Sequence, residues 1–269
     1  MRPTLHVQHL LHAVLALTGA FVIGVPYAAH ADERYEGVAY ALDGGQVLYR
    51  ETHWRYTQGG TMRRLVLYRC AHGEAFARKH VIDSPSATAP DFDFLDARDG
   101  YEEGVFSRKG QRVVYTRKDR SAARKETVVP VGANSVIDAG FDAMVRLHWE
   151  DISSGRPIKA PFLLPSRAEF LSFKIEQRDN ADTSQVRQLR MALDTWYGFA
   201  VPALELRYSV AGRRLLRFQG IATIRDRAGR YQNVRIEFPP DQIVHTISAQ
   251  ELQTAEIEPL VHECRGDTP

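Results

Sequence analysis

The sequence predicts an α+β protein, mainly of antiparallel β-structure, in which a curved open sheet or half-barrel of about a dozen strands wraps around one amphipathic helix. From Tyr35 onward, short runs of strand-forming residues alternate with turns that contain Gly or Asp. One segment, 138–155, repeats its apolar residues at the helical period. No stretch of 32–269 has the composition of a linker, so we expect a single domain over 32–269.

The first 31 residues have the features of a cleaved secretory signal peptide. Arg2 carries the only charge among them, and Leu10–Val25 is apolar apart from two polar residues and two glycines. That run is shorter than the about 20 residues of a spanning helix, it precedes Pro26, and Ala29-His30-Ala31 fits the A-x-A cleavage pattern. We therefore expect cleavage near Ala31, no transmembrane segment in the mature chain, and a soluble periplasmic or secreted product.

The charge balance argues against a general nucleic-acid binder. The chain has 35 Lys and Arg residues against 33 Asp and Glu residues, and one of the basic residues is Arg2. A protein that binds the phosphate backbone needs a clear basic excess. We expect no nucleic-acid partner.

The chain has two cysteines, Cys70 and Cys264. In an oxidising compartment they are candidates for a disulfide that ties the C-terminal tail to an early strand. The alternative is that Cys70 is a small buried apolar residue and Cys264 belongs to a frayed tail.

Hairpins account for most of the expected sheet. Gly-containing turns at 43–45, 59–60, 98–100 and 109–110 separate the early strands. After the helix, strands with one apolar and one polar face resume. The expected strands are 37–42, 46–56, 63–69, 75–82, 92–95, 101–106, 112–118, 126–131, 158–164, 169–177, 186–193, 204–210, 215–218 continuing to 221–224, and 231–238, followed by a short helix within 248–260.

The predicted helix covers Asp138–Gly155. Asp138 is a competent N-cap, and Gly155 stands where a C′ glycine ends a helix. At about 100° per residue, one apolar stripe faces the sheet, with Trp149 at its edge. The stripe consists of Ile137, Phe141, Met144, Val145, His148 and Ile152. If the helix leaves space beside the sheet, Trp149 and the stripe from Phe141 onward are the candidate ligand-binding residues; the alternative is a solid core.

Four segments occur in the order GGQVLYRE, VIDAGFD, LHWEDISSGRPIKAPFLLP and LLRFQGIATIRDRAGRYQNVRIEF. In this layout the chain resembles an uncharacterised proteobacterial secreted family with the shape of the LolA/LolB-type half-barrel carriers of lipoproteins. The resemblance implies an open sheet around a helix and a carrier of an apolar ligand. The basic stretch 108–125 has no counterpart in those carriers.

Glu51, His53 and Arg55 share one face of a predicted strand, and Trp54 points the other way. A carboxylate beside an imidazole can act as an acid/base pair, but exposed strand faces of mixed charge have the same pattern. The sequence contains neither a G-x-S-x-G elbow nor an H-E-x-x-H motif. His148 is either a ligand contact or a satisfied core histidine. We assign no catalytic residue, cofactor or metal and favour a non-enzymatic protein.

Asp91–Glu103 carries six acidic residues, and Arg108–Lys125 carries eight basic ones. The acidic segment does not fit an EF-hand, because Leu95 and Asp96 occupy a ligand position and the glycine position. The two segments are adjacent along the chain and can pair across neighbouring strands. The alternative is that the basic edge contacts anionic envelope lipid through Arg108, Lys109, Arg112, Arg117, Lys118 and Arg120.

The function that these features favour is non-enzymatic binding or carriage of an apolar or amphipathic, lipid-like molecule between sheet and helix. One alternative is a structural or partner-binding protein of the cell envelope without a cavity. A second is a hydrolase whose site residues are dispersed in the sequence.

Overall fold

The structure is a computed structural model that describes residues 30–178, 184–196 and 202–265. Residues 1–29 of the predicted signal peptide lie outside this part of the chain. The strands are β1 (His30–Ala41), β2 (Val47–Gln58), β3 (Thr61–Cys70), β4 (Ala75–Pro85), β5 (Pro90–Asp96), β6 (Tyr101–Arg108), β7 (Gln111–Arg117), β8 (Lys125–Val129), β9 (Val136–Ile137), β10 (Ile158–Leu164), β11 (Glu169–Gln177), β12 (Val186–Leu193), β13 (Leu204–Ser209), β14 (Leu215–Arg225), β15 (Tyr231–Glu237) and β16 (Val244–Ile247). The helices are α1 (Gly140–Leu147), α2 (Trp149–Ser153) and α3 (Ala249–Ile257), with 3₁₀ turns η1 (Pro165–Arg167) and η3 (Pro240–Gln242).

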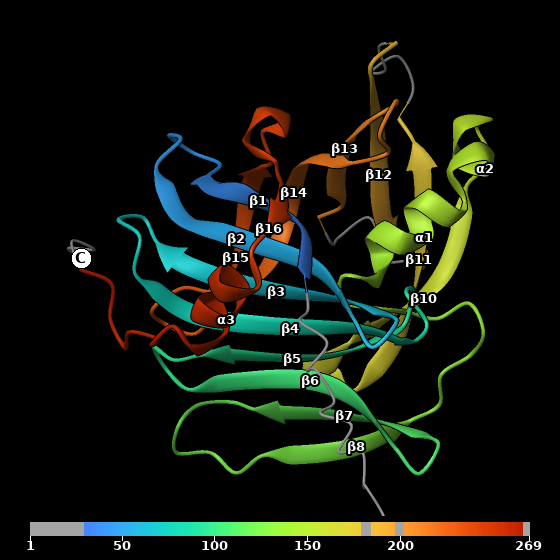
Figure 1. The fold of residues 1–269 in the computed structure, drawn as a ribbon. Coiled ribbons are helices and arrows are strands. Elements are labelled where there is room, and N and C mark those ends of the chain that lie inside the picture. The colour runs from blue at the N-terminus through green and yellow to red at the C-terminus, as the bar shows by residue number, and fades with distance from the viewer. Residues whose placement is uncertain (1–29, 179–183, 197–201, 266–269) are drawn as a thin grey trace, which may run out of the picture.

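All described strands belong to one sheet of 16 strands, in which β1 lies at the centre between β2 and β15. Neighbouring strands are antiparallel except β9 and β10, which are parallel. In Figure 1, β1–β8 form a first wall, and β10–β15 rise beside and behind it as a second wall. The prediction of a mainly antiparallel open sheet is confirmed. The strand number is higher than expected because β9 and β16 are too short to leave a clear two-residue period in the sequence.

Two tight hairpin turns set the register of the first wall. Gly59 and Gly60 join β2 to β3, and Lys109 and Gly110 join β6 to β7; all four have positive φ angles between 52° and 75°. Turns with positive φ at both central residues match the right-handed twist of the adjoining strands, and glycine adopts them without a Cβ clash. The hairpins predicted at these two positions are confirmed.

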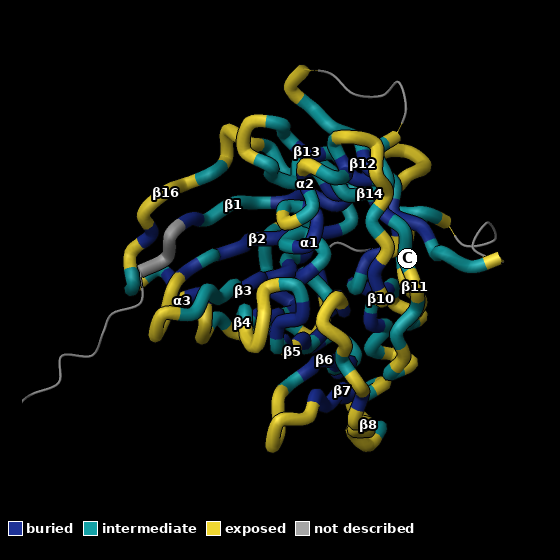
Figure 2. The backbone as a smooth tube through the Cα atoms, turned by 90° about the vertical axis from the view of Figure 1, so that its right-hand side faces the viewer, coloured by how far each residue is buried: buried dark blue, intermediate teal, exposed yellow. Residues whose placement is uncertain are grey.

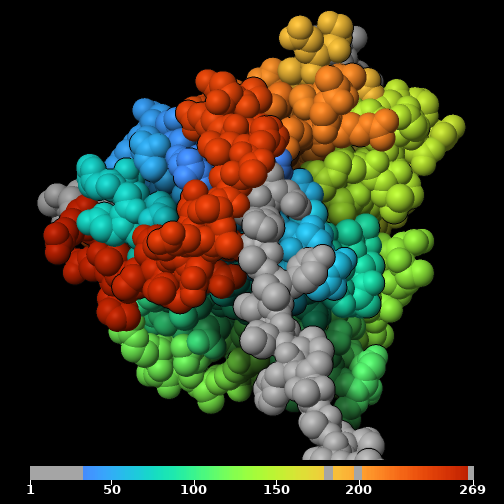
Figure 3. Space-filling view, in the orientation of Figure 1, coloured from blue at the N-terminus to red at the C-terminus, as the bar shows by residue number. Residues whose placement is uncertain are grey.

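Part of the outer face of the first wall is covered by the C-terminal segment, drawn in red in Figure 3. α3 packs Leu252 and Ala255 against apolar side chains of β2 and β3. Ser248 caps the helix, since its hydroxyl accepts a hydrogen bond from the Glu251 N–H. Side chains of β2 that point away from the interior, such as Trp54, are therefore buried as well.

Two further links hold the tail to β3. The Arg69 guanidinium donates to both oxygens of Glu258 at 2.5 and 2.8 Å. Cys70 and Cys264 form a disulfide, with their Cα atoms 5.5 Å apart. Of the two alternatives for the cysteines, the structure has the bonded one, and the C-terminal segment is covalently joined to an early strand.

α1 and α2 lie on the inner side of the sheet, between β1–β4 and β10–β11 in Figure 2. Their buried side chains form a core with the second wall. This core consists of Val136, Met144, Val145, Trp149, Ile152, Ala160, Ile175, Leu189, Met191, Leu206 and Tyr208. None of the described helices combines the length and the apolar character needed to cross a bilayer.

The prediction of one continuous helix from Asp138 to Gly155 is wrong in two respects. The helix breaks at His148, whose φ and ψ of −103° and 23° are not helical, so α1 and α2 are separate. Asp138 is not a cap, because its φ of 46° places it before the helix and its carboxylate pairs with Lys79 instead. Gly155 follows the end of α2 with a φ of 79°, as expected of a C′ glycine.

The acidic and basic segments pair with each other across β5, β6 and β7. Arg112 is buried and bonds to the Asp91 carboxylate, and Arg117 lies 2.6 Å from Glu102. Two other residues of the predicted envelope-binding set also have partners: Arg108 pairs with Glu126, and Arg120 donates to the Ala97 carbonyl. The remaining two, Lys109 and Lys118, have no ion pair in the described part of the chain. Contact with anionic lipid at this edge stays a prediction.

Candidate functional site

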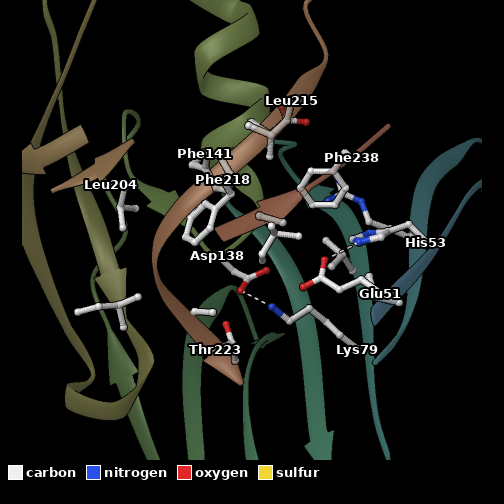
Figure 4. A pocket seen from close by; sticks show the side chains of 18 of the residues that line it. Glu51, His53, Lys79, Asp138, Phe141, Leu204, Leu215, Phe218, Thr223 and Phe238 are labelled. Carbon is white, nitrogen blue, oxygen red and sulfur yellow. Dashed lines mark hydrogen bonds and ion pairs between the residues drawn. The ribbon is translucent and has the colours of Figure 1, made fainter. Parts of the chain in front are cut away.

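A cavity of about 790 Å³ lies between the two walls and beside α1. Its volume is within the range of about 300–1,000 Å³ that is typical of small-molecule sites. Strands β1–β6 supply most of its charged side chains, and β10–β15 supply a mainly apolar lining (Figure 4). The cavity therefore has a polar side and an apolar side.

The register of the sheet arranges the side chains of the first wall in two rows. The first row crosses β1 to β6 and consists of Tyr35, His53, Val66, Lys79, Phe94 and Glu103. The second row crosses β1 to β4 and consists of Glu33, Arg55, Arg64 and Val81. Cross-strand partners lie on the same face of a sheet, and all of these residues except Phe94 line the cavity.

A buried ion pair links the first row to the start of α1. Lys79 Nζ lies 2.6 Å from Asp138 Oδ1, and the two side chains are only 7% and 11% exposed. The ammonium group also lies over the rings of Phe92 and Phe94, at 5.3 and 5.8 Å from their centroids. Since Asp138 lies two residues before Gly140, the first residue of α1, the pair ties the start of this helix to the first wall.

Glu51 and His53 form the pair whose residues the sequence places on one face of a strand. Glu51 Oε2 lies 2.8 Å from His53 Nε2, and both side chains are buried. Tyr35 stacks on the imidazole with the ring centroids 4.6 Å apart, and Phe238 lies edge-on at 5.8 Å. Burial lowers the pKa of His53, although the hydrogen bond with Glu51 opposes this, so the imidazole is neutral at pH 7.

The Glu51–His53 pair is a polar group in the cavity lining. His53 Nδ1 is buried and has no hydrogen-bond partner. Among the described residues, no Ser, Thr or Cys side chain is hydrogen-bonded to His53. What the pair offers is hydrogen-bonding capacity within the cavity.

Glu103 lies at the other end of the first row. Its carboxylate accepts a hydrogen bond of 2.6 Å from the Tyr101 hydroxyl, which lies 3.0 Å from the Tyr231 hydroxyl on β15. This chain of three groups joins β6 to the second wall. Burial raises the pKa of Glu103, although the bond from Tyr101 and the charge of Lys79 oppose the rise.

Glu103→Gln is expected to stabilise the protein at pH 8 and to have less effect at pH 4. Because the pKa of Glu103 is raised in the folded state, the folded protein retains a proton that the unfolded chain releases, and stability falls as the pH rises through this interval. Glutamine removes that loss and can still accept from Tyr101. Each pKa unit of the rise is equivalent to about 1.4 kcal/mol. Urea unfolding at both pH values measures the effect.

The matched control is Glu102→Gln, on the opposite face of the same strand. Glu102 pairs with Arg117 at 2.6 Å and is partly exposed, so its loss should cost about 0–1 kcal/mol. A Glu103→Gln variant that is less stable than the wild type at pH 8 would contradict the expectation.

The second wall faces the two rows with aromatic and aliphatic side chains. Figure 4 shows Leu204, Leu215, Phe218 and Phe238 around the space. The position of Phe238 depends on Gly37 on β1, because a Cβ atom at Gly37 would lie 2.5 Å from Phe238 Cε1. Further apolar lining residues are Phe162, Leu163, Leu171, Phe173, Met191, Leu193, Ile221 and Ile236.

Of the six predicted ligand-binding residues, Phe141 lines the cavity. Four others are buried in the core between the helices and the second wall, namely Met144, Val145, Trp149 and Ile152. His148 is not on the buried face, because the helix breaks there; its side chain is 38% exposed and lies 3.4 Å from Asp151. The stripe thus serves mainly to pack the helices, and the cavity is lined chiefly by the sheet.

Lys79, Arg64 and Asp138 were not identified from the sequence as residues of the site. Lys79 had a usable signal, since it lies between Ala77 and Val81 on the apolar face of a strand, where a lysine needs a partner. The partner, Asp138, is 59 residues away, and no local pattern indicates it.

Comparison with known proteins yields a likeness in structure. No protein-family model matches the chain, and no curated protein does. Among solved structures, the chain matches the crystal structure of a β-barrel-like protein from Brucella abortus, a domain of unknown function named DUF1849. The sequences are 9% identical, the match covers 81% of this chain and 98% of that chain, and the TM-score is 0.42. Function is therefore inferred from the residues of this chain.

Proposed function

We propose that the protein binds an amphipathic, lipid-like molecule in the cavity and does not catalyse a reaction on it. The observation that supports this is the division of the cavity into a polar and an apolar side. An apolar chain placed against the second wall would gain about 25 cal/mol per Å² of surface removed from water. A polar end would find hydrogen-bonding groups on the first wall, so it would not be buried without partners.

The charges of the first wall are compatible with a stable, preformed site. Glu33 lies 2.9 Å from Arg55 and 2.7 Å from Arg214, and Lys79 pairs with Asp138. Because these groups have partners, they can remain charged next to the cavity without a ligand. The volume of the cavity also argues against an envelope protein with a solid core.

We further propose that the protein acts outside the cytoplasm, with the space between sheet and helix used as in the LolA/LolB-type half-barrel carriers. The predicted signal peptide supports the location. The Cys70–Cys264 disulfide supports it as well, because disulfides persist in oxidising compartments.

Thr223→Trp is expected to weaken binding of an uncharged apolar fluorophore, N-phenyl-1-naphthylamine, by about tenfold or more. Thr223 is a half-buried cavity residue on β14, and an indole in its place would occupy space that the fluorophore needs. Fluorescence titration of the wild type and the variant measures the change, and thermal unfolding verifies that the variant is folded.

The control is Thr254→Trp, which places the same side chain on the exposed surface of α3 on the outer face of the sheet. It should bind the fluorophore as the wild type does. If the wild type does not bind, or if Thr223→Trp binds equally well, the cavity is not the site.

A further inference from the structure

The acidic side chains that line the cavity already have partners. The pairs are Glu33 with Arg55 and Arg214, Glu51 with His53, Glu103 with Tyr101, Asp138 with Lys79, and Asp142 with Arg146. A cationic ligand would therefore find no carboxylate without a partner in the described lining.

Two lining cations, Arg64 and Arg167, have no carboxylate within ion-pair distance among the described residues. Arg167 is exposed on η1, whereas Arg64 is half-buried on β3 and its Nε atom is buried without a hydrogen-bond partner. Arg55 is the register partner of Arg64 on β2, so the two arginine side chains leave the same face of the sheet from neighbouring positions. Like charges at such positions repel each other, and an anion between them would relieve the repulsion.

The charge of Arg64 acts on groups of both walls. Burial raises the pKa of the Tyr35 hydroxyl on β1 and of the Tyr208 hydroxyl on β13, and Arg64 opposes both rises. Burial also lowers the pKa of His53, and Arg64 lowers it further. Arg64 lines the cavity between the two walls, where its charge can act on these groups.

Three carboxylates favour the charged form of Arg64. Burial lowers its pKa, but Tyr35, Asp142, Asp83 and Asp138 outweigh this effect, so the pKa of Arg64 lies above its ordinary value. Arg64 is thus a permanent cation whose N–H donors are not engaged by an ion pair.

We propose that Arg64 binds the anionic head group of the ligand, a carboxylate or a phosphate that carries an apolar chain. A guanidinium presents parallel N–H donors that match two oxygens of either group. The apolar chain would extend along the second wall, past Phe218 and Leu204. This inference rests on the proposed function, since it assigns the class of ligand that the same cavity takes.

Competition with bound N-phenyl-1-naphthylamine tests the assignment with ligands of one chain length. Dodecanoate and dodecyl phosphate should displace the fluorophore at concentrations about tenfold or more below dodecyltrimethylammonium. Arg64→Gln should weaken both anions about tenfold or more and leave the cationic amphiphile unchanged. Acetate and inorganic phosphate should displace nothing, because they lack the apolar chain.

Arg63→Gln is the matched control, since Arg63 directly precedes Arg64 on β3, faces the other side and does not line the cavity. It should bind dodecanoate as the wild type does. Equal displacement by anionic and cationic amphiphiles, or full affinity of Arg64→Gln for dodecanoate, would overturn the role of Arg64 while leaving the proposed function intact. Tight binding of free phosphate at Arg64 would overturn the amphiphile assignment. Failure of the fluorophore itself to bind would count against the proposed function.

Discussion

Lys79→Met is expected to lower the free energy of unfolding by about 3–5 kcal/mol, because it leaves the Asp138 carboxylate buried without its cation. The loss should be large since Asp138 Oδ2 has no hydrogen-bond partner even in the wild type. Urea unfolding near pH 7 measures the change.

The double variant Lys79→Met/Asp138→Asn should recover much of that loss, because it removes both charges together. Lys174→Met is the control, since Lys174 pairs with Glu176 at 2.8 Å on a partly exposed face and should lose at most about 1 kcal/mol. If Lys79→Met and Lys174→Met had equal effects, the Lys79–Asp138 pair would not be the buried link that its geometry indicates.

Removal of the disulfide in Cys70→Ser/Cys264→Ser is expected to cost about 2–5 kcal/mol. The bond closes a loop with a sequence separation of 194 residues, so it restricts the unfolded chain strongly. Chemical unfolding of the oxidised wild type and the double variant, followed by tryptophan fluorescence, measures the difference.

Reduction separates the covalent link from the substitutions. The reductant should shift the unfolding midpoint of the wild type toward that of the double variant and leave the double variant unchanged. A wild type whose midpoint does not respond to reduction would show that the Arg69–Glu258 bonds and the packing of α3 hold the tail without the disulfide.

Much of the sheet could be predicted from sequence because its hairpins depend on residues that are neighbours in the chain. Gly59 and Gly60 between two strand-forming runs define one hairpin, and Lys109 and Gly110 define another. The short strands β9 and β16 could not be predicted in this way. Their residues become strands only through pairing with β10 and β1, which are remote from any local turn signal.

The position of the helical segment in the chain was predicted correctly, but its division into two helices was not. A helical wheel assumes an unbroken helix, and the non-helical backbone of His148 takes this one residue off the buried face, whereas Ile152 beyond the break is still buried with Met144 and Val145. His148 is for this reason half-exposed, whereas Trp149, expected at the edge of the stripe, is buried.

Part of the candidate site could also be predicted from the sequence, and part of it could not. Glu51 and His53 could be placed on one face because side chains alternate along a strand, and the structure brings them within 2.8 Å. The space next to them depends on the separation of two walls that are built from opposite halves of the chain. No repeating pattern of residues indicates how far apart the two walls lie. Neither the cavity nor the position of Arg64 in it could therefore be predicted from the sequence.

The central position of β1 in the sheet has a consequence for biosynthesis. One edge of β1 pairs with β2, the next strand to be made, whereas the other pairs with β15, close to the C-terminus. During synthesis this second edge stays without a partner until almost the whole chain has emerged, and such non-local pairing makes folding slow. An unpaired edge invites association with other chains. If the protein acts outside the cytoplasm, as proposed, export in an unfolded state would postpone this pairing until after translocation.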